Sequence, residues 1–272
     1  MKRKYLKYVI MGAISAIVAT SLLRPHEDIK KTPRDYNEII ASGELNVTTE
    51  YNSVSYYVEG DSLSGLHYEL IQAFAKDKGL KLHITPEMIL EKQIDGISNG
   101  TYDIIAHSIL VTSESKDSLL AFTTPILLNK QVLVQRKEEK SDSLFVHNQL
   151  ELAGKIVYIP HGSPVSYRIH NLSKEIGDTI IVKEMEKYGT EQLIAMVAHG
   201  DIDYAVCEAG IAQALLSDFP QLDINTQISF NQFYAWGVSK QSPVLLDSLN
   251  QWLHQFMKSK AYTTLLQRYQ RD

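Results

Sequence analysis

Asn99-Gly100-Thr101-Tyr102-Asp103-Ile104-Ile105-Ala106 recurs later in the chain as His199-Gly200-Asp201-Ile202-Asp203-Tyr204-Ala205-Val206. In each copy an amphipathic run ends at a Gly, one short turn follows, and an Asp leads into a β-branched or apolar run. A Gly just past a helix supplies the left-handed cap that residues with a Cβ resist. The apolar run after it is typical of a buried parallel strand. One such unit in each half predicts two α/β lobes with a cleft between them, where small ligands bind.

Length and composition limit the class of protein. The chain has 272 residues, of which 44% are hydrophobic and 22% charged, as in ordinary globular proteins with a substantial core. A net charge of −5 argues against a nucleic-acid partner, which calls for a basic face. Cys207 is the only cysteine, so we expect neither an internal disulfide nor a thiolate metal cluster. The apolar run around Cys207 predicts a small buried core residue, and nothing in the sequence calls for a cofactor.

The N-terminus has the pattern of an export segment. Four of the first seven residues are basic, the 16 residues of 8–23 are apolar, and a polar run begins at Arg24. The apolar part is shorter than the ~20 residues that span a bilayer comfortably. Residues 1–31 are therefore either a signal peptide with its linker, or an uncleaved anchor with its positive end in the cytoplasm. In both cases we expect the rest of the chain to work in the periplasm, free or anchored to the inner membrane by residues 8–23.

The rest of the chain alternates predicted helices and strands. Periodicity and capping residues predict a first series over residues 34–42, 44–49, 66–78, 80–85, 87–98 and 103–106. A second series follows over residues 155–159, from Pro164 onward, and over 180–183, 190–198 and 204–207, before a strand at 233–238 and two helices at 244–257 and 261–269. This order predicts mainly parallel sheets covered by helices on both faces.

The two series are joined by two predicted crossings, near residues 129–135 and 226–231. We therefore expect a first lobe built from residues 32–132 and 229–272 and a second lobe built from residues 133–228. Because the chain passes between the lobes twice, the crossings would act as a hinge.

Several motifs resemble, in order, the bacterial extracellular solute-binding proteins of family 3, the periplasmic amino-acid-binding type. The resemblance covers roughly residues 38–270. The matching stretches are Gly43-Glu44-Leu45-Asn46-Val47, Gly65-Leu66-His67-Tyr68-Glu69-Leu70 with Phe74-Ala75 and Gly79, Gly100 to Ala106 with Thr112-Ser113-Glu114, Phe122-Thr123-Thr124-Pro125, and Leu152-Ala153-Gly154-Lys155 with His161-Gly162-Ser163. The chain is also similar to the non-catalytic N-terminal half of membrane-bound lytic transglycosylase F.

The resemblance implies a type II periplasmic-binding-protein fold and the capture of a small, amino-acid-like polar solute between the lobes. An importer of the ABC type, with its permease as partner, would receive the solute. The alternative is a membrane-tethered sensor for cell-wall fragments or amino acids. The transglycosylase domain would need a further stretch with a catalytic Glu after residue 272, so we expect no enzyme.

The resemblance also implies the ligand-binding residues. An Arg that grips the ligand carboxylate in the family falls at Ser115 here, with Lys116 beside it; a lysine lacks the fork of a guanidinium. The start of a second-lobe helix at Gly162 and Ser163 would bind the carboxylate through backbone N–H groups, and Glu208 would meet the ligand ammonium. The remaining expected contacts are an aromatic wall and two hydroxyl side chains: Tyr51, Tyr56, Tyr57, Ser108 and Thr112.

Other interpretations have less support. Asp103 and Asp203 are expected to fix their turns rather than touch ligand. His67 and Glu69 form an H-x-E pattern, as in zinc deaminases, but the C-x-x-C partner of that motif is missing. No H-E-x-x-H, G-x-S-x-G or P-loop pattern occurs. The sequence leaves a serine hydrolase open, although no motif points to one.

Overall fold

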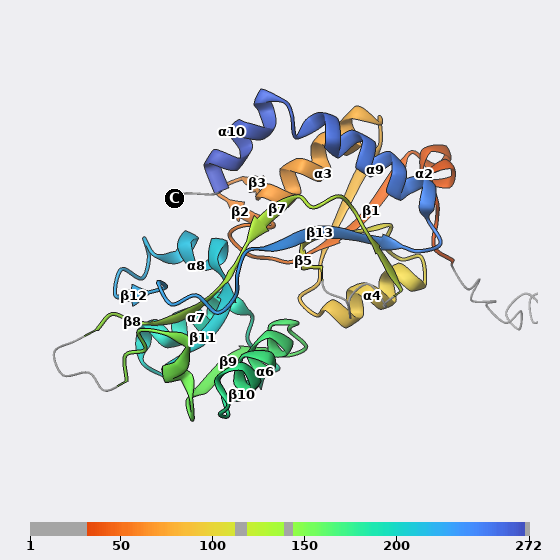
Figure 1. The fold of residues 1–272 in the computed structure, drawn as a ribbon. Coiled ribbons are helices and arrows are strands. Elements are labelled where there is room, and N and C mark those ends of the chain that lie inside the picture. Colours follow the sequence, from red (N-terminus) through yellow and green to blue (C-terminus); the bar gives the residue numbers. More distant parts are fainter. Residues whose placement is uncertain (1–31, 112–118, 139–143, 270–272) are drawn as a thin grey trace, which may run out of the picture. The chain divides into compact units, whose positions relative to one another are not determined.

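The computed structural model describes residues 32–111, 119–138 and 144–269, and these belong to one compact unit that covers Thr32–Asp272 (Figure 1). The predicted export segment, with residues 8–23, lies outside the described residues, as do Thr112, Ser115 and Lys116. Within the described part of the chain, no helix combines the length and the apolarity that a membrane crossing requires.

The first lobe is built on a sheet with the strand order β4-β1-β5-β13-β6, and β7 also pairs with β13. Strand β1 pairs in parallel with β4 and β5, whereas β13 runs antiparallel to β5, β6 and β7. The bounds of these strands are β1 Glu44–Thr49, β4 Lys81–Pro86, β5 Ile104–Leu110, β6 Leu120–Phe122, β7 Leu127–Asn129 and β13 Gln232–Ser239.

The second lobe repeats this plan with the order β10-β9-β11-β8-β12. Strand β9 pairs in parallel with β10 and β11, and β8 runs antiparallel to β11 and β12. The bounds are β8 Gln131–Arg136, β9 Ile156–Pro160, β10 Ile181–Met185, β11 Ala205–Glu208 and β12 Leu222–Asp223. Each sheet therefore has three parallel strands, as the β-α-β pattern predicts, and gains antiparallel strands where the chain crosses between lobes.

Helices cover both faces of each sheet (Figure 1). In the first lobe α3 and α9 pack on one face and α4 on the other, and in the second lobe α7 and α8 lie opposite α6. The first-lobe helices are α2 Tyr36–Ser42, α3 Leu66–Asp77, α4 Leu90–Ser98, α9 Pro243–Phe256 and α10 Lys260–Tyr269, with a hairpin of β2 Tyr57–Glu59 and β3 Ser62–Ser64. The second-lobe helices are η1 Gln149–Leu152, α6 Val165–Ile176, α7 Thr190–His199 and α8 Ala209–Leu215.

Helix α3 shows how the sequence pattern builds the core. Leu66, Leu70 and Phe74 recur at intervals of one turn, and all three are 0% exposed. The Phe74 ring meets the edge of the Trp252 ring from α9, with centroids 5.5 Å apart. Burial of each such side chain stabilises the fold by about 1.5–3 kcal/mol. The amphipathic face thus fixes α3 and α9 against one side of the first sheet.

The repeated octad forms the same unit in both lobes. Gly100 follows α4 with φ 71° and Gly200 follows α7 with φ 85°, so both take the left-handed conformation expected of them. Asp103 accepts hydrogen bonds from Nε of Arg34 at 2.9 Å and from the backbone N of Asn46 at 2.8 Å. Asp203 accepts one from Arg136 at 2.6 Å. The prediction that these two carboxylates hold their turns is confirmed.

The chain passes from the first sheet to the second between β7 and β8, and returns between β12 and β13 (Figure 1). The two crossings predicted from the sequence are therefore present. Strand β1 matches its predicted bounds, and the other predicted strands and helices are found with ends displaced by a few residues. The largest displacements are at β5, which extends to Leu110 instead of Ala106, and at α4, which begins at Leu90 instead of Glu87.

Candidate functional site

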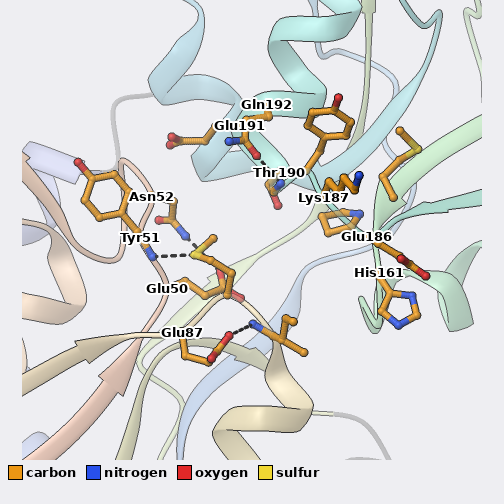
Figure 2. Close-up of a pocket in the computed structure, with 16 residues that line it drawn as sticks. Glu50, Tyr51, Asn52, Glu87, His161, Glu186, Lys187, Thr190, Glu191 and Gln192 are labelled. Atoms are coloured by element: carbon orange, nitrogen blue, oxygen red, sulfur yellow. Dashed lines mark hydrogen bonds between the residues drawn. The ribbon is translucent and has the colours of Figure 1, made fainter.

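The carboxyl ends of parallel strands from both lobes meet at one cleft. Residues just after β1 and β4 in the first lobe, and after β9 and β10 in the second, line a cavity of about 500 Å³ (Figure 2). This is the edge at which open α/β sheets bind their ligands. We name this cavity the outer chamber. Its walls are Glu50, Tyr51, Asn52, Glu87, Met88, Ile89, Pro160, His161, Met185, Glu186, Lys187, Tyr188, Gly189, Thr190, Glu191 and Gln192.

A smaller cavity of about 90 Å³, which we name the inner chamber, shares part of this wall. The shared residues are Glu50, Met88, Pro160, His161, Gly189 and Thr190. The inner chamber adds residues from the start of α4, from β5 and from the turn before α6, namely Leu90, His107, Ser108, Ile109, Leu110, Gly162, Ser163 and Pro164. Three residues predicted from the sequence, Ser108, Gly162 and Ser163, therefore line one cavity together.

Glu208 ends β11 beside the inner chamber and is partly buried. Its Oε1 accepts a hydrogen bond from Nδ2 of Asn129 at 2.8 Å. Burial raises the pKa of the Glu208 carboxyl to about 7; the nearby charge of Glu50 raises it as well, while hydrogen bonds from Asn129 and Ser108 lower it. A carboxylate with too few partners of its own is stabilised by an arriving cation. Glu208 lines neither chamber, and its link to the inner chamber is the hydrogen bond with Ser108.

Ser108 belongs to a buried chain of hydrogen bonds. The indole Nε1 of Trp236 donates to Nδ1 of His67 at 2.9 Å, and Nε2 of His67 lies 3.0 Å from the hydroxyl of Ser108. Burial lowers the pKa of His67 to about 3, with a further contribution from His107, so the ring is neutral. Since Nδ1 accepts from a group that only donates, the proton of the ring must sit on Nε2.

This tautomer decides what the Ser–His pair can do. His67 Nε2 donates to the Ser108 oxygen, so the ring cannot take the hydroxyl proton as a general base. The serine hydrolase that the sequence leaves open would need the opposite arrangement. The Ser108 proton is instead free to point toward Glu208, and the chain orients an acceptor-rich wall for ligand binding.

His107 is a site residue that the sequence analysis missed. Nε2 of Gln93 donates to the backbone oxygen of Glu87 at 2.6 Å, so the Gln93 oxygen faces Nε2 of His107, 2.7 Å away, and accepts from it. Nδ1 of His107 is then left without a hydrogen bond, 3.7 Å from Oε1 of Glu50. The side chain is buried and lines the inner chamber. Two acceptors that face each other in this way suit an N–H donor of a ligand.

The three predicted aromatic residues take different places. Tyr51 lines the outer chamber and is 46% exposed. Tyr56 packs edge-on between Tyr51 and Tyr68, with ring centroids 6.1 and 5.6 Å away, and so supports Tyr51 from behind. Tyr57 begins β2 and lines neither chamber. The predicted aromatic wall is therefore represented at the cleft by Tyr51.

The turn before α6 borders the inner chamber as predicted, but its amides are already engaged. Gly162, at φ 68°, donates its N–H to Oε2 of Glu184 at 3.0 Å. The N–H of Ser163 reaches the backbone oxygen of Pro160 at 3.2 Å, and Oγ of Ser163 accepts weakly from Val165 at 3.4 Å. The anion held at this turn is thus the side chain of Glu184, which also pairs with His161.

Glu191 and Ser53 form a direct contact between the lobes across the cleft. Glu191, in the first turn of α7, accepts hydrogen bonds from the backbone N of Ser53 at 2.7 Å and from the Ser53 hydroxyl. An acidic side chain is favourable at a helix N-terminus. Glu191 therefore stabilises the start of α7 and also forms the contact with Ser53 across the cleft. No motif signals this pair, whose members are far apart in the chain. Among the described residues, no three His, Cys, Asp or Glu side chains gather to hold a metal ion.

Curated relatives share part of their length with this chain. The chain is 27% identical over 243 residues to the membrane-bound lytic murein transglycosylase F of Desulfosudis oleivorans, which covers 89% of this chain and 52% of that protein. It is 30% identical over 203 residues to the protein of the same name in Aeromonas salmonicida, covering 75% and 40% respectively. The chain thus spans about half the length of the curated relatives it matches, or less.

Solved structures share the fold. Holo ArgBP from T. maritima superposes with a TM-score of 0.71 at 23% identity, covering 86% of this chain and 99% of that chain. A substrate-binding protein of an ABC uptake transporter from Streptococcus pneumoniae, solved with bound histidine, gives 0.74 at 16% identity, covering 86% and 94%. These similarities confirm the predicted type II two-lobe fold.

The family follows from the sequence match. The sequence pattern that describes bacterial extracellular solute-binding proteins, family 3, matches residues 45–272, which include every strand of both sheets except the first residue of β1. The chain belongs to the bacterial extracellular solute-binding proteins of family 3.

Proposed function

We propose that this protein captures a small polar solute with a free ammonium group, of the amino-acid type, in the cleft between its lobes. The observation that carries the proposal is the set of acceptors around the inner chamber. Glu50 and Nδ1 of His107 face each other at 3.7 Å, and Glu208, whose pKa is raised mainly by burial, lies beside Ser108. A bound ammonium would supply the positive charge and the N–H donors that these groups lack.

Both lobes contribute to the proposed site. The first lobe offers Tyr51, Ser108 and His107, and the second offers Ser163 and Glu208. We assign residues 32–132 and 229–272 to the first lobe and 133–228 to the second, with the two crossings as the hinge; strand β8, which begins at Gln131, runs across the first of these boundaries into the second lobe. A ligand that contacts both lobes favours the closed arrangement by its differential affinity for it.

A role in import agrees with the family, whose description is extracellular and solute-binding. In this role the protein works in the periplasm and delivers its solute to the permease of an ABC importer. Residues 1–31 act as a signal peptide or, if uncleaved, tether the protein to the inner membrane through 8–23. The orientation of His67 toward Ser108 supports binding without catalysis.

A second role is favoured by the curated relatives, which are named membrane-bound lytic murein transglycosylase F. In this role the cleft senses cell-wall fragments or amino acids and regulates a partner at the membrane. The two roles share the ligand site and differ in the event that ligand binding triggers.

Isothermal titration of the full chain with the standard amino acids tests the binding proposal. Glu208→Gln keeps the shape of the side chain but removes its charge, and a hydrogen bond to a charged group contributes about 1.5–3 kcal/mol. We therefore expect the Kd to rise about 10- to 100-fold. Glu59→Gln is the matched control, because Glu59 lies in β2 and lines neither chamber. Equal affinity of Glu208→Gln and wild type would remove Glu208 from the site.

Uptake measurements separate the two roles. In a strain that lacks this protein, an importer component predicts slower uptake of the radiolabelled ligand identified by titration. A sensor predicts unchanged uptake together with altered turnover of labelled murein. Restoration by wild type and not by Glu208→Gln would link either phenotype to the cleft.

A further inference from the structure

The different volumes of the two chambers limit how large a ligand each can hold. The inner chamber, of about 90 Å³, is well below the roughly 300–1,000 Å³ of pockets that enclose a drug-sized molecule. The outer chamber, of about 500 Å³, lies within that range. Six residues belong to the walls of both chambers, so the two cavities border each other. A single amino acid that fills the inner chamber would leave most of the outer chamber to water.

The walls of the outer chamber carry large, exposed apolar side chains. Tyr51 and Met88 from the first lobe are 46% and 47% exposed, and Tyr188 from the second is 43% exposed. Figure 2 shows Tyr51 on the opposite side of the cavity from the second-lobe residues Lys187 and Thr190. Exposed apolar groups that gather on both sides of one cleft mark a binding surface. Tyrosine adds a polar tip and loses little conformational freedom on binding.

Charge is distributed unevenly along the cleft. The acceptors Glu50 and His107 line the inner chamber, and Glu208 lies beside it through Ser108. Lys187 is the single Lys or Arg among the described residues that line either chamber. No salt bridge to another described residue engages Lys187. The family's carboxylate-binding Arg is replaced by Ser115 in the sequence.

Four carboxylates also line the outer chamber, and three of them accept hydrogen bonds from the protein: Glu50 from Asn52, Glu87 from Ile89 and Glu191 from Ser53, the fourth being Glu186. Lys187 is thus the one cationic side chain of this wall that can pair with a ligand carboxylate.

We infer that the outer chamber is a second ligand subsite, which holds the remainder of a short peptide whose amino end lies in the inner chamber. The inference rests on the proposed function, because Glu208, Glu50 and His107 receive the ammonium. The peptide carboxylate then pairs with Lys187, and the intervening residues lie against Tyr51, Met88 and Tyr188. A free amino acid without a cationic side chain places its only positive group next to its carboxylate and cannot use both ends of this cleft.

Calorimetric titration of the full chain with matched ligands tests this inference. For each standard amino acid X, the free amino acid, X-Ala and X-Ala-Ala are compared, together with X-Ala-Ala amide, which lacks the carboxylate. We expect the best tripeptide to bind at least 10-fold more tightly than its parent amino acid, and the amide to lose most of that gain. Equal or weaker binding of the tripeptides would overturn the second subsite while leaving the proposed function intact. Failure of every amino acid and every peptide to bind would overturn both.

Substitutions in the outer chamber test which residues provide the gain in affinity for the tripeptide over the free amino acid. Tyr188→Ala and Lys187→Met should each weaken the tripeptide about 10-fold and leave the free amino acid, where it binds, within 2-fold of wild type. Lys187→Met should also bind the tripeptide and its amide equally. Tyr167→Ala is the matched control, because Tyr167 lies on α6, is 57% exposed and lines neither chamber. Tripeptide affinity unchanged in both cleft variants would refute the subsite even if peptides bind.

Discussion

Glu208→Gln should stabilise the unliganded protein at high pH and leave it nearly unchanged at low pH. Burial raises the pKa of the Glu208 carboxyl to about 7 in the folded protein, whereas an unfolded Glu titrates near ~4.3. Between these two pH values the folded state binds the proton and the unfolded state has lost it. Stability from this group is thus fully present below about pH 4.3 and is lost as the pH rises through about 7.

The size of the effect follows from the same shift. At about 1.4 kcal/mol per pKa unit, a shift from ~4.3 to about 7 gives a ceiling of about 4 kcal/mol. Because the Glu208 side chain is only partly buried, solvent screening reduces this to about 1–2 kcal/mol. Gln keeps the oxygen that accepts from Asn129 and carries no charge, so the variant avoids the free-energy cost of a charged carboxylate at this position.

Thermal unfolding of the unliganded full chain at pH 4, 6 and 8 measures the effect. A domain of this size gains roughly 2–4 °C in Tm per kcal/mol. The Tm difference between Glu208→Gln and wild type should therefore grow by about 2–8 °C from pH 4 to pH 8. Glu59→Gln should show no such trend, since Glu59 is exposed on β2. A difference for Glu208→Gln that does not change with pH would refute a charge penalty at this position.

Three further predictions concern the frame around the site. Glu191→Ala removes the charged contact with Ser53, so the unliganded protein should open, with a larger radius of gyration in small-angle scattering, and the open-to-closed ratio should rise about 10- to 100-fold. Gly100→Ala should lower Tm more than Gly200→Ala: a Cβ would meet backbone 2.2 Å away at Gly100, and at Gly200 nothing nearer than a side chain at 3.8 Å. His67→Gln should be less stable than wild type at pH 7 but lose less stability down to pH 4. The reason is that burial lowers the pKa of His67 to about 3, so only the unfolded state gains a proton as the pH falls below about 6.5.

Each of these has a clear contrary result. An unchanged radius of gyration in Glu191→Ala would show that the contact does not hold the lobes together. Equal losses of Tm at the two glycines would mean that left-handed backbone strain, common to both, outweighs the steric clash at Gly100. Parallel pH profiles of wild type and His67→Gln would indicate that His67 takes up a proton in the folded state.

Much of the fold could be predicted because its signals are local. The glycine at position 100 or 200 stops a helix through its own backbone freedom, and the apolar run behind it forms a strand wherever both faces are covered. The spacing of Leu66, Leu70 and Phe74 specifies which face of α3 is buried. Such patterns act over a few residues, so one sequence is enough to place most of the strands and helices of both lobes.

The candidate site was predicted in part, because strand ends are local features whereas side-chain partners are not. Glu208 ends β11, Ser108 lies in the last part of β5, and Gly162 and Ser163 follow β9, so the fold brought them near the cleft. Tyr57 shares the loop of Tyr51 but lies in a hairpin away from both chambers. Its place depends on strand pairing that the sequence of the loop does not reveal.

The sequence by itself determined the two α/β lobes, the double crossing and the chemical types of residue at the strand ends. Only the tertiary structure decided how these residues act. It fixed the proton of His67 on the nitrogen that faces Ser108, left Nδ1 of His107 without a partner, and joined Ser53 to Glu191 across the cleft. These properties depend on hydrogen bonds and desolvation between segments distant in the chain. Chain order does not record such contacts, because they exist only once the lobes have folded and met.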